Sequence, residues 1–256
     1  MTLIESVILG FVEGITEFLP ISSTGHLILT SSLLGLPDSE FLKSFEIVIQ
    51  SGAIAAVLAL YWRSFLDLNI LKKITVAFLP TAIIGFTLYP LLKSHLLGSE
   101  QIVLWALLFG GAALILFELL HHESKDDTVH INSITYRQSA WIGLFQSVAV
   151  IPGVSRSGAS IVGGLAIGLP RKVIVEFSFL LAVPTLVAAT GYDLLRSAHA
   201  FSADQASALA VGFITSFIVA LGSIVFLLRF VQHHTFIPFG IYRIVVAVIF
   251  WLFVFN

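Results

Sequence analysis

Two stretches of the chain carry polar residues within apolar surroundings, and their spacing constrains the fold more than any other feature. The first runs from Gly10 to His26 and reads GFVEGITEFLPISSTGH, and the second runs from Gly143 to Gly158 and reads GLFQSVAVIPGVSRSG. A shift of 133 positions, without a gap, aligns their glycines and hydroxyl residues. The aligned pairs are Gly10 with Gly143, Glu13 with Gln146, Ser22 with Ser155, Thr24 with Ser157 and Gly25 with Gly158. We interpret the two stretches as equivalent segments of two related halves.

The composition indicates that both stretches lie inside a membrane protein. Hydrophobic residues make up 57% of the 256 residues, charged residues make up 11%, and the mean hydropathy is +1.01. A soluble domain has about a quarter charged residues. Several apolar runs reach the roughly 20 residues that cross a bilayer. The absence of cysteine excludes disulfides, thiolate metal sites and cysteine nucleophiles.

Each polar stretch predicts a break between two short helices. Residues 3–19 are expected to form an apolar helix that ends before Pro20, because proline removes a backbone donor and clashes with the preceding turn. Ser22, Ser23 and Thr24 then offer N-caps for a second short helix at about 25–35. Residues 138–151 and 156–169 repeat this pattern. Irregular backbone at membrane depth needs to be buried in protein or to line a wet cavity, so we expect two re-entrant hairpins.

Three apolar spans follow each hairpin, which predicts an all-α polytopic membrane protein with six transmembrane helices. The expected spans are 45–62, 74–93, 101–121, 173–195, 207–230 and 237–255. The chain is read as one membrane domain, 1–256, with a first half at 1–122 and a second half at 136–256. Three crossings per half is an odd number, so the second half is expected to be inverted, with the two hairpins meeting near the midplane.

The basic residues of the predicted loops indicate the orientation. One face collects Arg63, Lys72, Lys73, Lys125, Arg137, Arg171, Lys172 and Arg229. The other face collects only Lys43, Lys93 and Arg196. Because basic loops favour the cytoplasmic side, we expect both termini to lie outside. Glu118 and Arg243 are expected near cytoplasmic helix ends, where long side chains extend into the interface.

Glu13 and Glu17 are candidates for an acidic site. They are four residues apart on a helix and therefore share one face. Two carboxylates at membrane depth repel each other and are poorly solvated, so they either share a proton or hold a cation. The simpler alternative, that Glu13 lies in the wet interface, does not explain why both residues precede the break.

His26 falls in the first turn of the second short helix. The positive end of that helix disfavours the imidazolium, so the ring is expected to stay neutral and able to act as a base or nucleophile. A structural role is the usual reading of a lone histidine, and the polar neighbours favour catalysis here.

Arg156 is the candidate phosphate ligand. It lies between Ser155 and Ser157, with Gly153 and Gly158 allowing close approach of the backbone. A buried guanidinium needs an anion, and its planar fork of donors suits phosphate. Hydroxyls and free N–H groups at two helix N-termini add to an anion site. The alternative is an ion pair from Arg156 to one of the two glutamates.

A divalent metal reconciles acidic residues with a phosphate site. Glu13 and Glu17 would bind it on one side and phosphate oxygens on the other. Oxygen ligands without cysteine favour a hard ion, magnesium or calcium. The expected chemistry is phosphoryl transfer to water from an amphiphilic substrate whose tail stays in lipid.

Four segments resemble one known family. EGITEFLPISSTGH (Glu13 to His26) and PGVSRSGAS (Pro152 to Ser160) are similar to the two motifs of bacterial undecaprenyl-pyrophosphate phosphatases, the bacitracin-resistance family. The similarity continues through FEIVIQSGAIAAV (Phe45 to Val57) and EFSFLLAVP (Glu176 to Pro184). The motifs are long, and their polar positions show no departure from the family pattern.

The resemblance implies that the enzyme removes the terminal phosphate from a C55 isoprenoid pyrophosphate, which recycles the lipid carrier of cell-wall synthesis. It implies a location in the bacterial plasma membrane and an active site that opens to the outer, periplasmic side. Glu13 and Glu17 carry over as the acidic, metal-linked motif. Ser22, Ser23, Thr24 and His26 carry over to the first tip, and Ser155, Arg156 and Ser157 to the second. The attacking group stays open between a serine, with Ser23 preferred, His26 and a metal-activated water.

Two rival functions are considered beside the phosphatase. Inverted repeats with broken helices are also typical of transporters, so a transporter or flippase of the lipid carrier is the main alternative. A non-catalytic lipid-binding subunit is the weaker one, because it gives the acid pair, the histidine and the arginine no common purpose. The expected partners are a polyprenyl pyrophosphate lipid and the bilayer, without nucleic acid, and a homodimer is left open.

Overall fold

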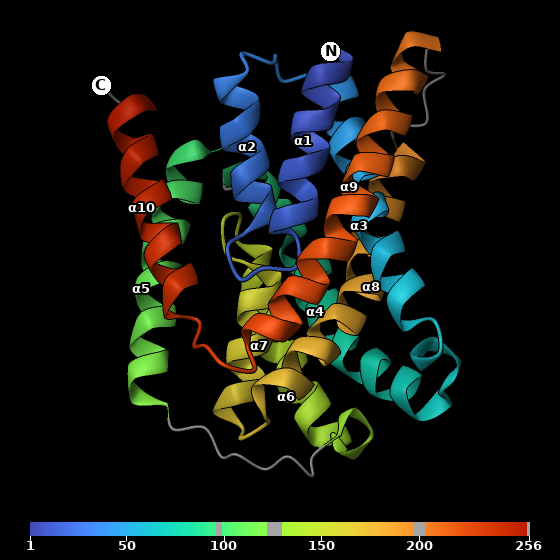
Figure 1. Cartoon of the computed structure of the whole chain (residues 1–256), viewed down its shortest axis with the longest axis vertical. Coiled ribbons are helices and arrows are strands. Elements are labelled where there is room, and N and C mark those ends of the chain that lie inside the picture. The colour runs from blue at the N-terminus through green and yellow to red at the C-terminus, as the bar shows by residue number, and fades with distance from the viewer. Residues whose placement is uncertain (96–98, 122–129, 197–202, 255–256) are drawn as a thin grey trace.

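The computed structural model of the chain describes residues 1–95, 99–121, 130–196 and 203–254, and within these ranges it contains helices and no strand. Figure 1 shows their arrangement. The α-helices are α1 (Leu3–Thr16), α2 (Ser23–Leu33), α3 (Glu40–Tyr61), α4 (Leu68–His95), α5 (Glu100–Leu120), α6 (Tyr136–Gln146), α7 (Arg156–Ala166), α8 (Arg171–Arg196), α9 (Ala203–Phe230) and α10 (Ile237–Val254). Three short 3-10 helices are η1 (Ser64–Leu66), η2 (Ile131–Ser133) and η3 (Ser147–Val150).

Five of the described helices, α3, α4, α5, α8 and α9, are long and apolar enough to cross a membrane. In α10 the apolar stretch within the described residues, Ile237–Leu252, is shorter. The chain is therefore a multi-pass helical membrane protein. Helix α3 begins at Glu40, before the expected start at 45, because the Ser39 hydroxyl accepts a hydrogen bond from Leu42 N at 3.2 Å and caps it.

Four helices are too short to cross a bilayer. Helix α1 has 14 residues, and α2, α6 and α7 have 11 residues each. At 1.5 Å per residue, 11 residues span about 16 Å, roughly half of a hydrocarbon core about 30 Å thick. Threonines start α1 and α6 in the same way. Thr2 and Thr135 each form a capping box, with Glu5 and Gln138 as the respective partners.

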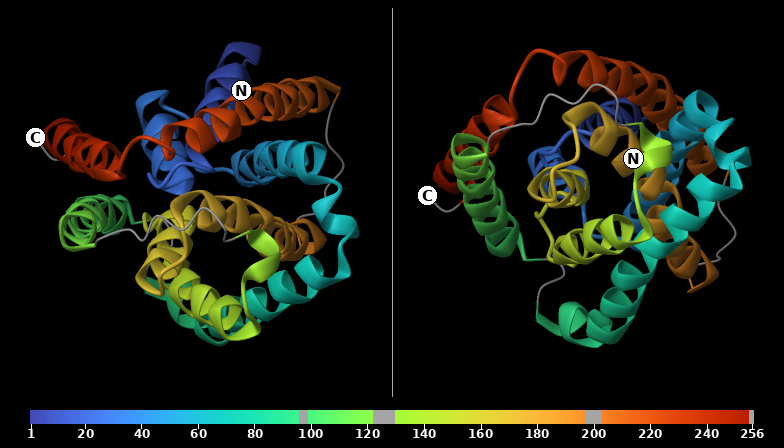
Figure 2. Two further views of the ribbon diagram at one scale, coloured as in Figure 1. Left: turned by 60° about the horizontal axis from the view of Figure 1, so that its bottom comes forward. Right: turned by 90° about the horizontal axis from the view of Figure 1, so that it is seen from below.

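The short helices form two pairs that approach each other from opposite ends of the molecule. In Figure 1, α1 and α2 lie in the upper half, α6 and α7 lie in the lower half, and the start of α1 and the end of α10 both lie at the upper end. Seen from below in Figure 2, α2 and α7 lie near the centre, with longer helices around them. The first connecting segment, residues 17–22, is buried, whereas the second, residues 147–155, is partly exposed at Val148 and Ile151.

Close helix packing holds each short pair against a long helix. Helix α1 packs on α9, and α6 packs on α4. A Cβ at Gly10 would stand 2.6 Å from Gly212 O of α9, and a Cβ at Gly143 would overlap Ala77 O of α4. Glycine at these two aligned positions therefore permits the backbones to approach.

A buried ion pair corrects one expectation from the sequence. Glu118 of α5 does not extend into an interface: both of its oxygens accept from Arg171 of α8, and Oε1 also accepts from Phe236 N at 3.1 Å. The hydrogen bond from Arg171 Nη2 to Glu118 Oε2 measures 2.8 Å. The side chains of Glu118 and Arg171 are both buried. The pair joins α5, α8 and the segment that precedes α10. Lys125, one of the basic loop residues, lies outside the described ranges.

Candidate active site

The first tip is the segment between α1 and α2, residues 17–22. Ser22 adopts φ +72°, a left-handed conformation that costs energy for a residue with a Cβ and is common at functional sites. Its hydroxyl accepts from Gly25 N at 3.4 Å and so caps α2. The expected N-cap is confirmed, and the helix begins at Ser23.

The second tip is the segment between α6 and α7, residues 147–155. It begins with the 3-10 helix η3 and turns at Gly153, which has φ +88°. The Ser155 hydroxyl accepts from Gly158 N at 3.0 Å and caps α7. Ser155 thus repeats the capping role of Ser22, with which it aligns in sequence.

Hydrogen bonds tie the two tips together. The Ser157 hydroxyl donates to Leu19 O at 2.8 Å, and the Ser155 hydroxyl donates to the same oxygen at 3.4 Å. The two hydroxyls are 3.0 Å apart. Ser155 and Ser157 therefore hold the backbone of the first tip in this state of the protein.

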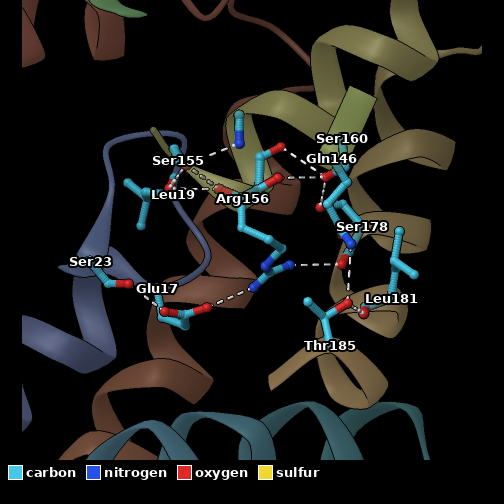
Figure 3. Close-up of polar contacts among 12 residues, drawn as sticks. Glu17, Leu19, Ser23, Gln146, Ser155, Arg156, Ser160, Ser178, Leu181 and Thr185 are labelled. Carbon is cyan, nitrogen blue, oxygen red and sulfur yellow. Dashed lines mark hydrogen bonds and ion pairs between the residues drawn. The ribbon is translucent and has the colours of Figure 1, made fainter. Parts of the chain in front are cut away.

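Glu17 connects the polar side chains of both tips. Its Oε2 accepts a hydrogen bond from the Ser23 hydroxyl, and its Oε1 forms an ion pair with Arg156 Nη2 at 2.8 Å. Arg156 Nη1 donates to Ser178 O of α8 at 2.9 Å. Figure 3 shows this row of contacts from Ser23 to Ser178. The ion pair considered as an alternative from the sequence is therefore present.

One nitrogen of Arg156, Nε, is buried and has no hydrogen-bond partner among the described residues. The guanidinium carbon lies 5.9 Å from the centre of the Phe18 ring, so that ring covers one face of the group. An anion that reaches Arg156 could be bound through Nε without breaking the contact to Ser178.

Glu13 lies beside Glu17 and is fully buried. Neither of its carboxylate oxygens has a hydrogen-bond partner among the described residues. The charges that act on it are those of Glu17, Glu46 and Arg156, so carboxylates outnumber cations around it. A buried acidic cluster with orphaned oxygens needs a proton or a cation.

These residues fit a hard divalent cation. Glu13 and Glu17 offer oxygen ligands, and the orphaned oxygens of Glu13 are free to coordinate. No group of three or more histidine, aspartate or glutamate side chains is arranged to hold a metal in the part of the chain that the structure describes. Two carboxylates, with substrate phosphate and water as the remaining ligands, are a usual set for Mg²⁺.

His26 is held at both ring nitrogens. Nδ1 lies 2.7 Å from Ser22 O, and because a carbonyl can only accept, Nδ1 carries a proton. Nε2 lies 3.0 Å from the hydroxyl of Tyr242 on α10. The two rings are nearly parallel, with centres 5.5 Å apart. In a neutral ring, Nε2 therefore accepts a hydrogen bond from the Tyr242 hydroxyl.

Several site neighbours were not predicted from the sequence. Tyr242 was not singled out. Arg243 was expected to extend towards an interface, and this is wrong: it is buried, with its guanidinium at the two tips. Ser178 was also missed. Tyr242 and Arg243 lie on α10 and Ser178 lies on α8, far along the chain from their partners, so spacing carries no signal for these contacts. Thr24, which was predicted to bind substrate, is exposed at the start of α2 and lies outside the cluster.

The fold and the site together define a class: an integral membrane protein with an acidic, hydroxyl and guanidinium centre built where two broken helix pairs meet. Within that class, the chain belongs to the bacitracin resistance protein BacA family, whose model matches residues 6–249.

The chain is similar over nearly its whole length to curated relatives. It is 52% identical over 252 residues to the undecaprenyl-diphosphatase of Sulfurihydrogenibium sp. (strain YO3AOP1), covering 98% of this chain and 99% of the relative. It is 50% identical over 255 residues to that of Persephonella marina, covering 99% and 100%. It is also 50% identical over 251 residues to that of Aquifex aeolicus (strain VF5), covering 98% of both.

Proposed function

We propose that this protein hydrolyses undecaprenyl pyrophosphate to undecaprenyl phosphate and inorganic phosphate, and so returns the lipid carrier to cell-wall synthesis. One observation carries the proposal: a chain similar end to end to undecaprenyl-diphosphatases has Ser23, Glu17 and Arg156 in direct contact inside an apolar bundle. An amphiphilic pyrophosphate needs both an intramembrane anion site and an apolar path for its tail.

We place the protein in the bacterial inner membrane with six spans, two re-entrant hairpins and both termini outside. The lengths of α1, α2, α6 and α7 support the hairpins, since none of them could cross alone. The shared position of the start of α1 and the end of α10 in Figure 1 supports an even number of crossings. Basic loops then favour an active site that opens to the outer side.

Two related halves, 1–122 and 136–256, account for the matching details of the fold. The capping boxes at Thr2 and Thr135 are 133 residues apart, as are the caps Ser22 and Ser155. The contact of α1 with α9 has its counterpart in the contact of α6 with α4. Inverted halves explain why the tips meet at one place rather than lie side by side in one leaflet.

Arg156 binds the anionic oxygens of the terminal phosphate in this proposal. Its ion pair with Glu17 keeps the guanidinium in place before substrate arrives, and its buried Nε–H is the donor available to a phosphate oxygen. The N-termini of α2 and α7 add positive potential. Ser22, Ser155, Ser157, Gly153 and Gly158 shape these two helix starts.

Ser23 is the attacking group that the contacts favour. Its hydroxyl already donates to Glu17, which can take the proton as the Ser23 oxygen bonds to the terminal phosphorus. The bond from that phosphorus to the bridging oxygen breaks, and undecaprenyl phosphate leaves. Water then attacks the phosphoserine, the P–Oγ bond breaks, and Ser23 regains a proton as inorganic phosphate departs.

His26 supports this centre through its backbone contact at Ser22 rather than by attacking phosphorus. The Tyr242 hydroxyl occupies its Nε2 lone pair, and Ser22 O occupies Nδ1–H. Both contacts fix the ring in one tautomer at the N-terminus of α2. A ring held in this way can still act on a proton in the second step once Tyr242 moves aside.

Glu13 and Glu17 would hold the divalent cation, magnesium or calcium. Bound there, it would polarise phosphate oxygens and neutralise the charge that builds on them. The orphaned oxygens of Glu13 support this assignment.

Phosphate release from undecaprenyl pyrophosphate by the purified protein, with and without chelator, tests the function. We expect turnover that chelator abolishes, and a loss of about 10²–10³-fold for Arg156→Ala, the range seen when one donor to a developing anion is removed. Ser23→Ala is expected to be inactive. Ser31→Ala is the matched control, because the Ser31 hydroxyl is buried on the same helix without a partner among the described residues.

Two outcomes contradict the proposal. Transport of intact pyrophosphate across proteoliposomes without phosphate release would favour the flippase. Turnover that Arg156→Ala leaves unchanged would remove the phosphate-binding role of the guanidinium.

A further inference from the structure

Arg243 of α10 is a second buried guanidinium at the tips, and the reaction described above does not use it. Its side chain is 3% exposed. Nη2 donates to Gly153 O of the second tip at 3.1 Å and to Ala106 O of α5 at 2.8 Å. Nη1 donates to Pro20 O of the first tip and Nε to Leu107 O, both at 3.4 Å. One side chain thus contacts both tips and a spanning helix.

The partners of Arg243 are all backbone carbonyls. No carboxylate forms an ion pair with it in the described parts of the chain. A buried cation without a counter-ion is costly in a low-dielectric interior, and carbonyl dipoles offset only part of the cost. We therefore expect the buried guanidinium of Arg243 to serve through its geometry, because a guanidinium can donate hydrogen bonds in several directions within one plane.

A glycine makes room for this group. A Cβ at Gly110 of α5 would overlap Arg243 Nη2 and would stand 2.8 Å from its Cζ. Any other residue at Gly110 would therefore push the guanidinium off the tips, although it would not change Arg243 itself. The absence of a side chain at Gly110 of α5 thus leaves the space that the Arg243 side chain of α10 occupies.

We propose that Arg243 is a positioning residue that holds the two tips in register with each other and with α5. The inference rests on the proposed function, because register matters for bringing Ser23 and Glu17 of one tip to Arg156 of the other. Pro20 adjoins Leu19, whose carbonyl accepts from Ser157, and Gly153 lies two residues before the cap Ser155. Loss of the Arg243 contacts would let these segments shift, and a misplacement of about 1 Å can cost roughly 10²-fold in rate.

Three variants separate position from charge. Arg243→Gln removes both the fork and the charge, Arg243→Lys keeps the charge but cannot reach the carbonyls in the same way, and Gly110→Ala displaces the native guanidinium. We expect all three to lower kcat by about 10–100-fold and to change KM by less than about threefold. Gly222→Ala on α9 is the control, because a Cβ there meets no atom within 4 Å, and it should keep wild-type kcat.

A second readout does not need activity. The chain has no cysteine, so a pair can be introduced cleanly. A Cβ at Gly158 would stand 3.5 Å from the Cβ of Pro20, within the range that a disulfide spans. Pro20→Cys with Gly158→Cys should cross-link readily under mild oxidation. The cross-linked fraction should fall at least about threefold when Arg243→Gln or Gly110→Ala is added, and it should not fall with Gly222→Ala.

The kinetic and cross-linking measurements together distinguish a failure of this inference from a failure of the proposed function. An unchanged cross-linked fraction in Arg243→Gln and Gly110→Ala would overturn the inference, whatever the rates show. A wild-type protein that releases no phosphate would remove the proposed function, while the cross-linking comparison would still decide whether Arg243 holds the tips. Wild-type rates in Arg243→Lys would show that charge alone suffices and would also overturn it. Thermal unfolding of each variant in detergent identifies any that fail to fold, and Gly110→Ala then tests the inference with Arg243 intact.

Discussion

Glu17 makes a polar contact through each of its two carboxylate oxygens. The Ser23 hydroxyl donates to one oxygen and Arg156 donates to the other, so in the proposed mechanism the same carboxylate would prepare the attacking group and hold the phosphate-binding group. In the proposed mechanism, a phosphate that binds Arg156 would compete with Glu17 for the guanidinium. Substrate binding and the contact of Ser23 with Glu17 would thus be coupled through one residue.

The contact between Tyr242 and His26 gives the first prediction. Tyr242→Phe keeps the stacked ring and removes the hydroxyl that donates to Nε2. We expect kcat to fall about 3–10-fold, the cost of losing one hydrogen bond of about 1 kcal/mol at a ring that must be held in place. In nitrogen NMR spectra of histidine-labelled protein, the Nε2 resonance of His26 should shift. Tyr136→Phe, at an exposed tyrosine on α6, is the control, and an unmoved Nε2 signal in Tyr242→Phe would contradict the assignment.

Replacement of Glu13 gives the second prediction. Glu13→Gln replaces a buried carboxyl group, which needs a proton or a cation and has no hydrogen-bond partner among the described residues, with a neutral amide. In chelator, the variant should unfold about 2–4 °C above the wild type, the shift that roughly 1 kcal/mol produces in a chain of this size. Added Mg²⁺ should raise the melting temperature of the wild type more than that of the variant. Equal Mg²⁺ effects on both proteins would show that Glu13 holds no cation.

The polar residues of the tips could be predicted from the sequence because breaks in apolar runs are local signals. Pro20 and the serines that follow it mark a break in the apolar run, and Ser22, one of the expected N-caps, caps α2. Arg243 gave no such signal. An arginine in an apolar run extends to an interface or turns inward depending on what the neighbouring helix leaves open, and Gly110 lies on another helix. Glu118 was misread for the same reason, since its partner Arg171 is 53 residues away.

At the scale of elements, the short helices make the site and the long helices hold it. Helices α2 and α7 present their N-termini at the centre of the bundle, and α1 and α6 are packed against α9 and α4 through glycines. The buried pair Glu118 and Arg171 fastens α5 to α8, and through Phe236 it fixes the start of α10. That link lies away from the tips, so its loss should affect stability more than chemistry.

The Glu118–Arg171 pair gives the third prediction. Glu118→Ala leaves a buried guanidinium without its carboxylate and should lower the free energy of unfolding by about 3–5 kcal/mol. The exposed pair of Lys43 with Asp38, 3.2 Å apart, is the control, and Lys43→Ala should cost under about 1 kcal/mol. Unfolding by denaturant in mild detergent measures both. A loss for Glu118→Ala no larger than that of Lys43→Ala would show that the ion pair does not hold the helices together.

At the scale of the whole molecule, we propose two halves that would each supply an incomplete site. The first half would bring Glu13, Glu17 and Ser23, and the second would bring Arg156. The 133-residue shift, which is visible in the sequence without coordinates, is the basis of this division. The ends of the spans were predicted less accurately, because a cap such as Ser39 extends a helix beyond its apolar run.

The orientation in the membrane gives the fourth prediction. Single cysteines introduced at Ser64 and at Lys172 should react with an impermeant maleimide only when the reagent can reach the cytoplasmic face of the membrane. A cysteine at Asp38 should react from outside in intact cells. The absence of native cysteine makes the unsubstituted chain a clean background. Labelling of Asp38→Cys and Lys172→Cys from the same side would contradict six spans with both termini outside.

The place of Arg243 in the chain has a consequence for biosynthesis. Residues 13 to 156 leave the ribosome well before residue 243, so a nascent chain displays the acidic pair, the serine and the phosphate-binding arginine while the brace across the tips is still missing. If Arg243 positions the tips as proposed, membrane insertion of α10 would complete the site. Truncated translation products that lack α10 would then carry every reactive group and yet hydrolyse the carrier lipid more slowly than the full chain.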